Sequence, residues 1–348
     1  YVERMQAEVQ LWLDGLGEAG EIEITKEMLR LTQFVVGHAF LGESFRDELD
    51  EAFWDEYTHI SNSLNPAIPV HWPIPKNIRR DQARKKIMQT LDKVIGKRRD
   101  SPDQYDDLIT LLLNTPLKDG QPMTDEEIKM LFMGLVFAGH ETTAGQAAWL
   151  MISLLQHQSY FQEVRRDIKE HFEYDQPITG RVLRNMKHIY WAIDEVTRLY
   201  PSAQLQMRLV EEDIDLGLFN IPKGWLVMVN AANSHHLPEL WENPKSFDPY
   251  RFSPERGEGK NSFSIIGFGG GIHKCTGINF AKNEMAVIAT LLFQQFHLEL
   301  ITDDTRILTG MGAARPTPTI LRYRRRVPSF DYTDEVKTML DNLVSLPS

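Results

Sequence analysis

Apolar positions recur at i, i+3, i+4 and i+7 through the first two-thirds of the chain, with polar residues between them. This spacing is typical of amphipathic helices that bury one face. It predicts helices over residues 1–16, 25–41, 106–114, 124–157, 159–172 and 186–200, and a basic helix starting near Asn77. Thr124 and Glu127 match a capping box, which favours the start of the longest helix at this point.

From Leu205 onward the pattern changes to short alternating runs, which are typical of strands. Strands are expected over residues 213–218, 225–230 and 319–324. A further helix is expected to begin just after Cys275 and to run to about Phe296. The fold class predicted is mainly α with small β-sheets. We expect one domain over residues 1–326 and a C-terminal tail or linker over 327–348.

Composition and charge narrow the function classes. The 348 residues are 42% hydrophobic and 25% charged, as in ordinary globular proteins, and the net charge of -11 argues against a nucleic-acid partner. The single cysteine fits a reducing compartment, so a cytoplasmic location is expected. The chain starts at Tyr1 without a visible signal peptide, which suggests that the true N-terminus is missing and leaves membrane anchoring unknown.

One segment is long and apolar enough to raise the question of a membrane span. Residues 130–156 carry one formal charge, Glu141. A charge at the centre of a span is costly in lipid, and Glu141 lies among further polar residues, His140 to Thr143. The pattern therefore favours a long buried helix over a transmembrane helix.

Cys275 lies in the loop Phe268-Gly-Gly-Gly-Ile-His-Lys-Cys-Thr-Gly277. One reading is a buried structural thiol, because free cysteine is among the most buried residue types. The context favours a metal ligand instead. A predicted helix start follows, and unpaired N–H groups there stabilise a thiolate. The glycines allow a flat cofactor to approach the backbone, Phe268 could shield the sulfur, and His273 could meet carboxylates of a cofactor.

A second motif, Ala138-Gly-His-Glu-Thr-Thr143, interrupts the long apolar helix. Hydroxyl side chains in a helix can bond back to its carbonyls and bend it, which would open space against a flat ligand. Glu141 and Thr142 then form an acid and alcohol pair able to pass protons. The alternative is a polar kink without chemistry. A zinc motif is excluded, because it needs a second histidine where the chain has Ala144.

A third motif is Glu195-Val-Thr-Arg198, whose spacing places both side chains on one helix face. On a surface this would be an ordinary ion pair of little energetic weight. Arg251, in the later segment Phe247-Asp-Pro-Tyr-Arg-Phe252, could complete a buried Glu–Arg–Arg cluster. Two other signals are expected to be structural: the basic run 79–86 as a solvated helix face, and His235-His236 as part of a loop.

In this order, the three motifs resemble the cytochrome P-450 family of haem-thiolate monooxygenases, and the resemblance covers residues 1–326. It implies the P-450 fold without its N-terminal portion, roughly one hundred residues in length. That portion normally supplies the first strands of a sheet, a loop over the substrate and a helix that contacts the haem propionates. The resemblance makes Cys275 the proximal ligand of haem b.

The resemblance also distributes roles over the other motif residues. Glu141 and Thr142 would be catalytic and serve oxygen activation, while Glu195, Arg198 and Arg251 would be structural. The implied haem contacts are Cys275, His273, Arg208, Phe268, Gly269, Gly277 and Ala138. The candidate substrate contacts are Phe132, Met133, Phe137, Met207 and Met311. Core packing is the alternative for each of these five, because apolar stripes usually face cores.

Within the family the chain is most similar to sterol 14α-demethylases, especially bacterial ones. The similarity lies in the segments ending at Arg84, His140, Arg208 and Arg326. Glu141 departs from that subfamily, which usually has a second histidine there.

The implied activity is insertion of one atom of O2 into a C–H bond of an apolar substrate, including sterol 14α-demethylation. Electrons would come from a donor such as a ferredoxin and its reductase. Hydroxylation of a fatty acid or terpenoid remains an alternative, as does a non-catalytic haem-binding module or inactive fragment.

Overall fold

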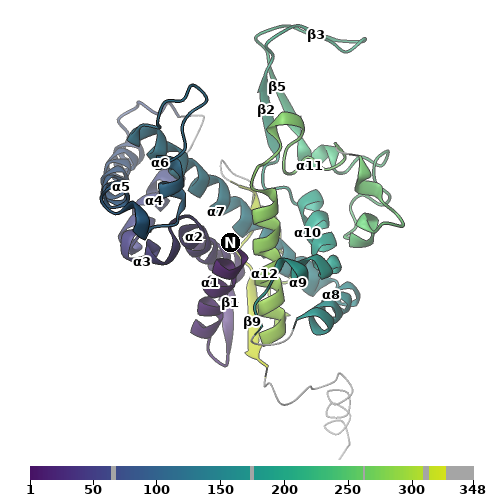
Figure 1. The fold of residues 1–348 in the computed structure, drawn as a ribbon. Helices are drawn as coiled ribbons and strands as arrows, with labels where there is room; N and C mark the ends of the chain where they lie inside the picture. The colour runs from purple at the N-terminus through teal and green to yellow at the C-terminus, as the bar shows by residue number, and fades with distance from the viewer. Residues whose placement is uncertain (64–67, 173–175, 262, 309–312, 327–348) are drawn as a thin grey trace, which may run out of the picture.

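The computed structural model describes residues 1–63, 68–172, 176–261, 263–308 and 313–326 (Figure 1). The expected fold class is confirmed: the chain is mainly helical, with small sheets. The α-helices are α1 (Val2–Gly15), α2 (Ile24–Leu41), α3 (Phe45–Glu48), α4 (Glu51–Ser61), α5 (Pro75–Asp100), α6 (Leu108–Leu113), α7 (Asp125–Gln156), α8 (Gln158–His171), α9 (Gly180–Asn185), α10 (Lys187–Leu199), α11 (Ala231–Ser234) and α12 (Ile278–Gln295). Met311 and the tail 327–348 lie outside the described residues.

Local sequence explains where the main helices begin. At α7, the Thr124 side chain accepts a hydrogen bond from the Glu127 N–H, and the Glu127 carboxylate accepts one from the Thr124 N–H. The capping box that was predicted is therefore present. Asp50 caps α4 by accepting from the Phe53 N–H at 2.9 Å, and Pro75 occupies the first turn of α5, where its missing N–H costs nothing.

Helix α7 is the central element of the core, and it packs against α2, α10 and α12. Its second half is buried on all sides and rich in small residues, which lets neighbouring backbones approach. A Cβ atom on Gly145 would lie 2.9 Å from the Ala314 carbonyl oxygen, so this approach requires glycine. A second apolar cluster joins the end of α2 to α4, α5, α6 and the first half of α7.

In the part of the chain that the structure describes, the strands form four small antiparallel sheets, of which the largest has the order β1-β9-β6. The strands are β1 (Ala19–Glu23), β2 (Leu205–Leu209), β3 (Ile214–Asp215), β4 (Asn220–Ile221), β5 (Leu226–Asn230), β6 (Phe296–Leu300), β7 (Ile307–Leu308), β8 (Arg315–Pro316) and β9 (Ile320–Arg325). β2 pairs with β5, and this ribbon extends away from the helices (Figure 1). The strand expected over 213–218 is shortened to β3, because the chain turns at Gly217, whose φ is 81°.

Two further expectations are tested by the helices. The long segment 130–156 lies within α7, and no helix of the described residues is long and apolar enough to cross a membrane. The basic run 79–86 lies on α5, mostly exposed, as expected for a solvated helix face. Two of its side chains, Arg79 and Lys86, form ion pairs with Glu56 of the neighbouring α4.

Candidate functional site

Cys275 is held in a tight loop that precedes α12, and its side chain is exposed. Its N–H donates to the Phe268 carbonyl at 2.8 Å, which closes the loop into a narrow turn. Gly269 has a φ of 75°, a conformation that disfavours other residues, and a Cβ atom there would lie 2.8 Å from the His273 carbonyl oxygen. The loop therefore depends on glycine at position 269.

The sulfur also lies close to the start of α12. A Cβ atom on Gly277, the residue that precedes the first helical turn, would be 3.8 Å from Cys275 Sγ. Among the described residues no side chain caps this helix end, so its first N–H groups remain available. The positive end of the helix dipole favours a negative charge nearby. The Cys275 sulfur therefore lies beside the positive end of α12.

The other candidate cofactor contacts are exposed at His273 and Ala138 and half-buried at Arg208, Phe268, Gly269 and Gly277. His273 is exposed in the cysteine loop, and the neighbouring Ile272 is 96% exposed. Arg208 on β2 donates to its neighbour's carbonyl oxygen, and within the described residues its guanidinium has no carboxylate partner. Ala138 on α7 is exposed as well. Ala138 thus offers apolar surface, His273 an imidazole and Arg208 a guanidinium.

Glu141 and Thr142 each bond elsewhere rather than to one another. The Thr142 hydroxyl donates to the Ala138 carbonyl at 2.7 Å, which is the back-bond that the sequence predicted. The Glu141 carboxylate accepts a hydrogen bond from the Ser61 hydroxyl of α4. Helix α7 nevertheless runs without interruption from Asp125 to Gln156.

The candidate substrate contacts divide between core and surface. Phe132 is fully buried and packs edge-to-face against Phe40 in the core, and its contact with substrate stays a prediction. Met133 is half-buried against the same cluster. Phe137 and Met207 are 40% and 57% exposed. They can meet a ligand without displacing core packing.

Glu195, Arg198 and Arg251 come together in a fully buried cluster. Arg198 donates to both oxygens of Glu195 at 2.8 Å, and Arg251 Nε donates to Glu195 Oε1 at 3.1 Å. Arg198 also donates to backbone carbonyls, including that of Pro244 at 2.6 Å. Removing one member of such a cluster typically costs about 3–5 kcal/mol, because a buried charge is left unpaired.

His235 connects this cluster to the cysteine loop and Trp241 packs against the cluster, and the sequence did not single out either role. His235 Nδ1 donates to the Arg198 carbonyl, and its Nε2 accepts from the Ile266 N–H, both at 2.9 Å. Burial lowers the pKa of His235 to about 4, so the ring stays neutral and can make both bonds. Trp241 lies against both guanidinium groups, 5.2 and 5.7 Å from its ring centroid. Since Ile266 leads directly into the loop, this network anchors the loop.

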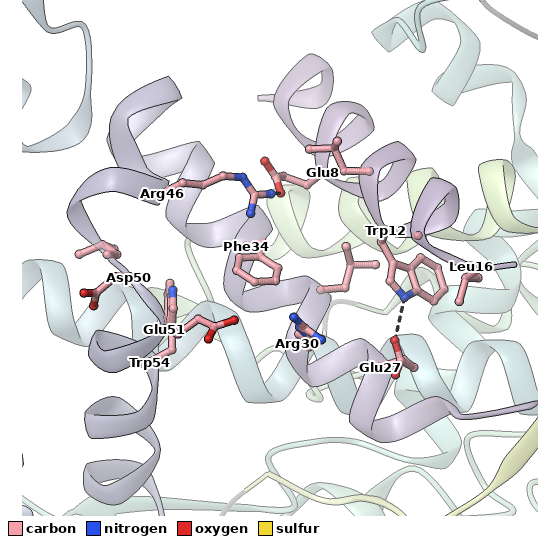
Figure 2. A pocket seen from close by; sticks show the side chains of 14 residues that line it. Glu8, Trp12, Leu16, Glu27, Arg30, Phe34, Arg46, Asp50, Glu51 and Trp54 are labelled. Atoms are coloured by element: carbon pink, nitrogen blue, oxygen red, sulfur yellow. Dashed lines mark hydrogen bonds and ion pairs between the residues drawn. The ribbon is translucent and has the colours of Figure 1, made fainter.

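A surface cavity of about 650 Å³ lies elsewhere, between α1, α2 and the start of α4 (Figure 2). Figure 2 shows Trp12, Phe34 and Trp54 on its walls, with the Trp12 indole donating to Glu27 at 2.8 Å. None of the lining residues belongs to the cysteine loop or to the motif at 138–143. Within the described residues, no group of three metal-ligating side chains is present either. The candidate site is therefore the single cysteine and its surroundings.

The fold and this site define a class of mainly helical protein with one exposed cysteine at the start of α12. Its longest helix, α7, carries a polar motif and packs against α12. The family model for cytochrome P450 matches residues 1–321, and the chain belongs to the cytochrome P450 family.

Two relatives show how far the similarity extends. The chain is 30% identical over 337 residues to a sterol 14alpha-demethylase of Mycolicibacterium vanbaalenii, covering 93% of this chain and 74% of that protein. It is 31% identical to a sterol 14-demethylase of Arabidopsis thaliana, covering 94% and 69%. The solved structure of a retinoic acid-bound cyanobacterial P450 is similar with a TM-score of 0.85 and 28% identity, covering 93% and 74%. The chain is thus a member of a family of haem-containing monooxygenases.

Proposed function

We propose that Cys275 is the thiolate ligand of haem iron in this monooxygenase. The observation that carries the proposal is the exposed sulfur of the lone cysteine, held by a glycine-dependent loop at the uncapped start of α12. When bound, haem would supply the dioxygen chemistry, and a thiolate ligand would favour O–O cleavage. The protein would supply the thiolate ligand, the proton donors and the shape of the pocket.

The residues around Cys275 fit a haem group. A flat apolar ring needs close approach to backbone, which Gly269 and Gly277 permit, and apolar cover, which Phe268 and Ala138 offer. Its two carboxylates need cationic or N–H partners, and the exposed His273 and the half-buried Arg208 carry such groups. We assign these residues as haem contacts.

We assign the transfer of protons to Glu141 and Thr142. Because the Thr142 hydrogen is donated to the Ala138 carbonyl, the Thr142 oxygen keeps its lone pairs and can accept a hydrogen bond from a bound ligand. The Glu141 carboxylate, held by Ser61, can exchange a proton with solvent or with a nearby water.

We expect Thr142→Ala to divert electrons from product to hydrogen peroxide, because an accepting group that orders the proton supply is lost. The measurement is product formed per electron pair consumed, in a purified, haem-loaded enzyme supplied by a ferredoxin and its reductase. Thr143→Ala is the matched control, because Thr143 is buried in the same helix turn. Unchanged coupling in Thr142→Ala would exclude the proton role.

For the substrate, we propose an extended apolar lipid of the sterol or isoprenoid type. The named relatives act on sterols, and the similar cyanobacterial structure holds retinoic acid. Phe137 and Met207 are the exposed apolar side chains available to it. Titration with sterols, retinoids and fatty acids should shift the haem absorption with the first two classes. A shift with fatty acids alone would contradict the proposal and favour a fatty acid hydroxylase.

A further inference from the structure

Helix α4 presents two polar residues, one helical turn apart, to two consecutive residues of α7. Tyr57 and Ser61 have the i, i+4 spacing that places side chains on one face of a helix. Opposite them lie His140 and Glu141: the Tyr57 and His140 rings are 5.5 Å apart, and the Ser61 hydroxyl bonds to Glu141. The sequence alone did not predict a role for Tyr57 or Ser61.

Ser61 is the group that orients the Glu141 carboxylate. The Ser61 hydroxyl donates to Glu141 Oε1. Across the described part of the chain, no arginine, lysine or histidine forms an ion pair with Glu141. The position of this carboxylate therefore depends on one neutral donor, which fixes a direction without the strong attraction of a cation.

Tyr57 and His140 carry complementary hydrogen-bonding groups that lack partners. His140 Nε2 lies 2.9 Å from the Leu29 carbonyl, which can only accept, so Nε2 carries the hydrogen and Nδ1 is an acceptor. Within the described residues, Nδ1 and the Tyr57 hydroxyl are both buried and both unbonded. Burial lowers the pKa of His140 to about 4, which keeps the ring neutral and its Nδ1 lone pair free.

A buried donor next to a buried acceptor is almost always satisfied in a folded protein, directly or through ordered water. The edge-to-face arrangement of the two rings, with an interplanar angle of 71°, does not itself join the two polar atoms. One water molecule between them would bond to both, since it can accept from the Tyr57 O–H and donate to His140 Nδ1.

We propose that α4 is the positioning element for Glu141: Ser61 orients its carboxylate, and a buried water that joins Tyr57 to His140 holds α4 against α7. The role assigned to Ser61 rests on the proposed function of Glu141, whereas the water site does not. In this proposal Ser61 is a positioning residue, because it acts through Glu141.

The test of Ser61 compares two substitutions. Ser61→Ala removes the donor and should lower product formed per electron pair about tenfold, the loss that corresponds to one hydrogen bond to a charged group. Ser61→Thr keeps the hydroxyl and should restore coupling. KM should change little in either variant, because substrate contacts are untouched. Thr58→Ala, on an exposed face of α4, is the matched control.

The outcomes separate this inference from the function on which it rests. If Ser61→Ala couples like the unaltered protein while Thr142→Ala does not, the positioning role is wrong and the proton role of the site stands. If neither substitution affects coupling, the function proposed for Glu141 and Thr142 fails as well. If Ser61→Ala loses coupling and Ser61→Thr does not restore it, the hydroxyl is not the relevant group, and the inference fails.

The water site is tested without haem turnover. In protein labelled with 15N-histidine, Tyr57→Phe should shift the His140 Nδ1 resonance toward that of a nitrogen without a hydrogen bond, and leave Nε2 bonded to Leu29. A crystal structure should show one water within hydrogen-bond distance of both atoms. An unchanged Nδ1 resonance, or a dry contact between the rings, would overturn this part of the proposal.

Discussion

Burial lowers the pKa of both His140 and His235 to about 4, well below the usual value of 6.5. His235 shows why the fold requires a neutral ring: one nitrogen donates to the Arg198 carbonyl, while the other accepts from the Ile266 N–H. Protonation would place a second hydrogen against that N–H donor, beside the buried Arg198 guanidinium. Protonation of His235 would therefore break the hydrogen bond to Ile266 that anchors the cysteine loop.

These two histidines predict acid sensitivity. The unfolded chain takes up their protons as the pH falls through 6.5, whereas the folded chain does so only near 4, so stability falls between these values. Each histidine contributes up to about 3 kcal/mol of this loss. The free energy of unfolding can be measured with urea at several pH values in this range. It should fall less steeply with acid for His235→Gln than for the unaltered protein.

His171→Gln, at an exposed helix end, is the control and should keep the full slope. A His235→Gln protein that loses stability with acid as steeply as the unaltered protein would show that the His235 ring is not held neutral.

At the scale of elements, the cysteine loop and α12 act as one unit. Two glycines in the loop have positive φ, but they differ in their surroundings: a Cβ on Gly269 would lie 2.8 Å from the His273 carbonyl oxygen, whereas one on Gly271 would meet open space. The first position is constrained by conformation and by contact, the second by conformation alone. The loop therefore tolerates substitution unequally.

We expect Gly269→Ala to reduce haem content strongly, because the turn must open to relieve the contact and the sulfur moves with it. Gly271→Ala carries only the conformational penalty, about 1–2 kcal/mol. The ratio of haem absorbance to protein absorbance after purification measures the difference. Equal haem content in the two variants would show that the close contact at Gly269 does not govern the loop.

Helical elements were predictable from sequence where apolar residues recur on one face, as in α8 and α10. Helix α7 was predictable from its long apolar run and from the capping box that marks its start. Strand β1 was not, because Ala19-Gly-Glu-Ile-Glu23 has weak strand propensity and is held in place by pairing with β9, three hundred residues away in sequence. His235 was missed for the same reason: its partners, Arg198 and Ile266, are brought to it only by tertiary packing.

At the scale of the whole molecule, α7 and α12 link the separate motifs. The Glu195–Arg198–Arg251 cluster lies at one end of α10, which packs on both of these helices, and His235 joins that cluster to the segment before Cys275. The motif residues were predictable because each belongs to a short local pattern. The contacts that join these motifs could not be predicted, because they are formed by side chains that are distant in sequence.

The central claim is that Cys275 supplies a thiolate to haem iron, and the reduced, carbon monoxide-bound spectrum tests it most directly. The unaltered protein should show the long-wavelength Soret band that a thiolate ligand gives. Cys275→Ser should lose that band, while Lys274→Ala, an exposed neighbour in the same loop, should keep it. A Cys275→Ser protein that retains the long-wavelength band would contradict the account.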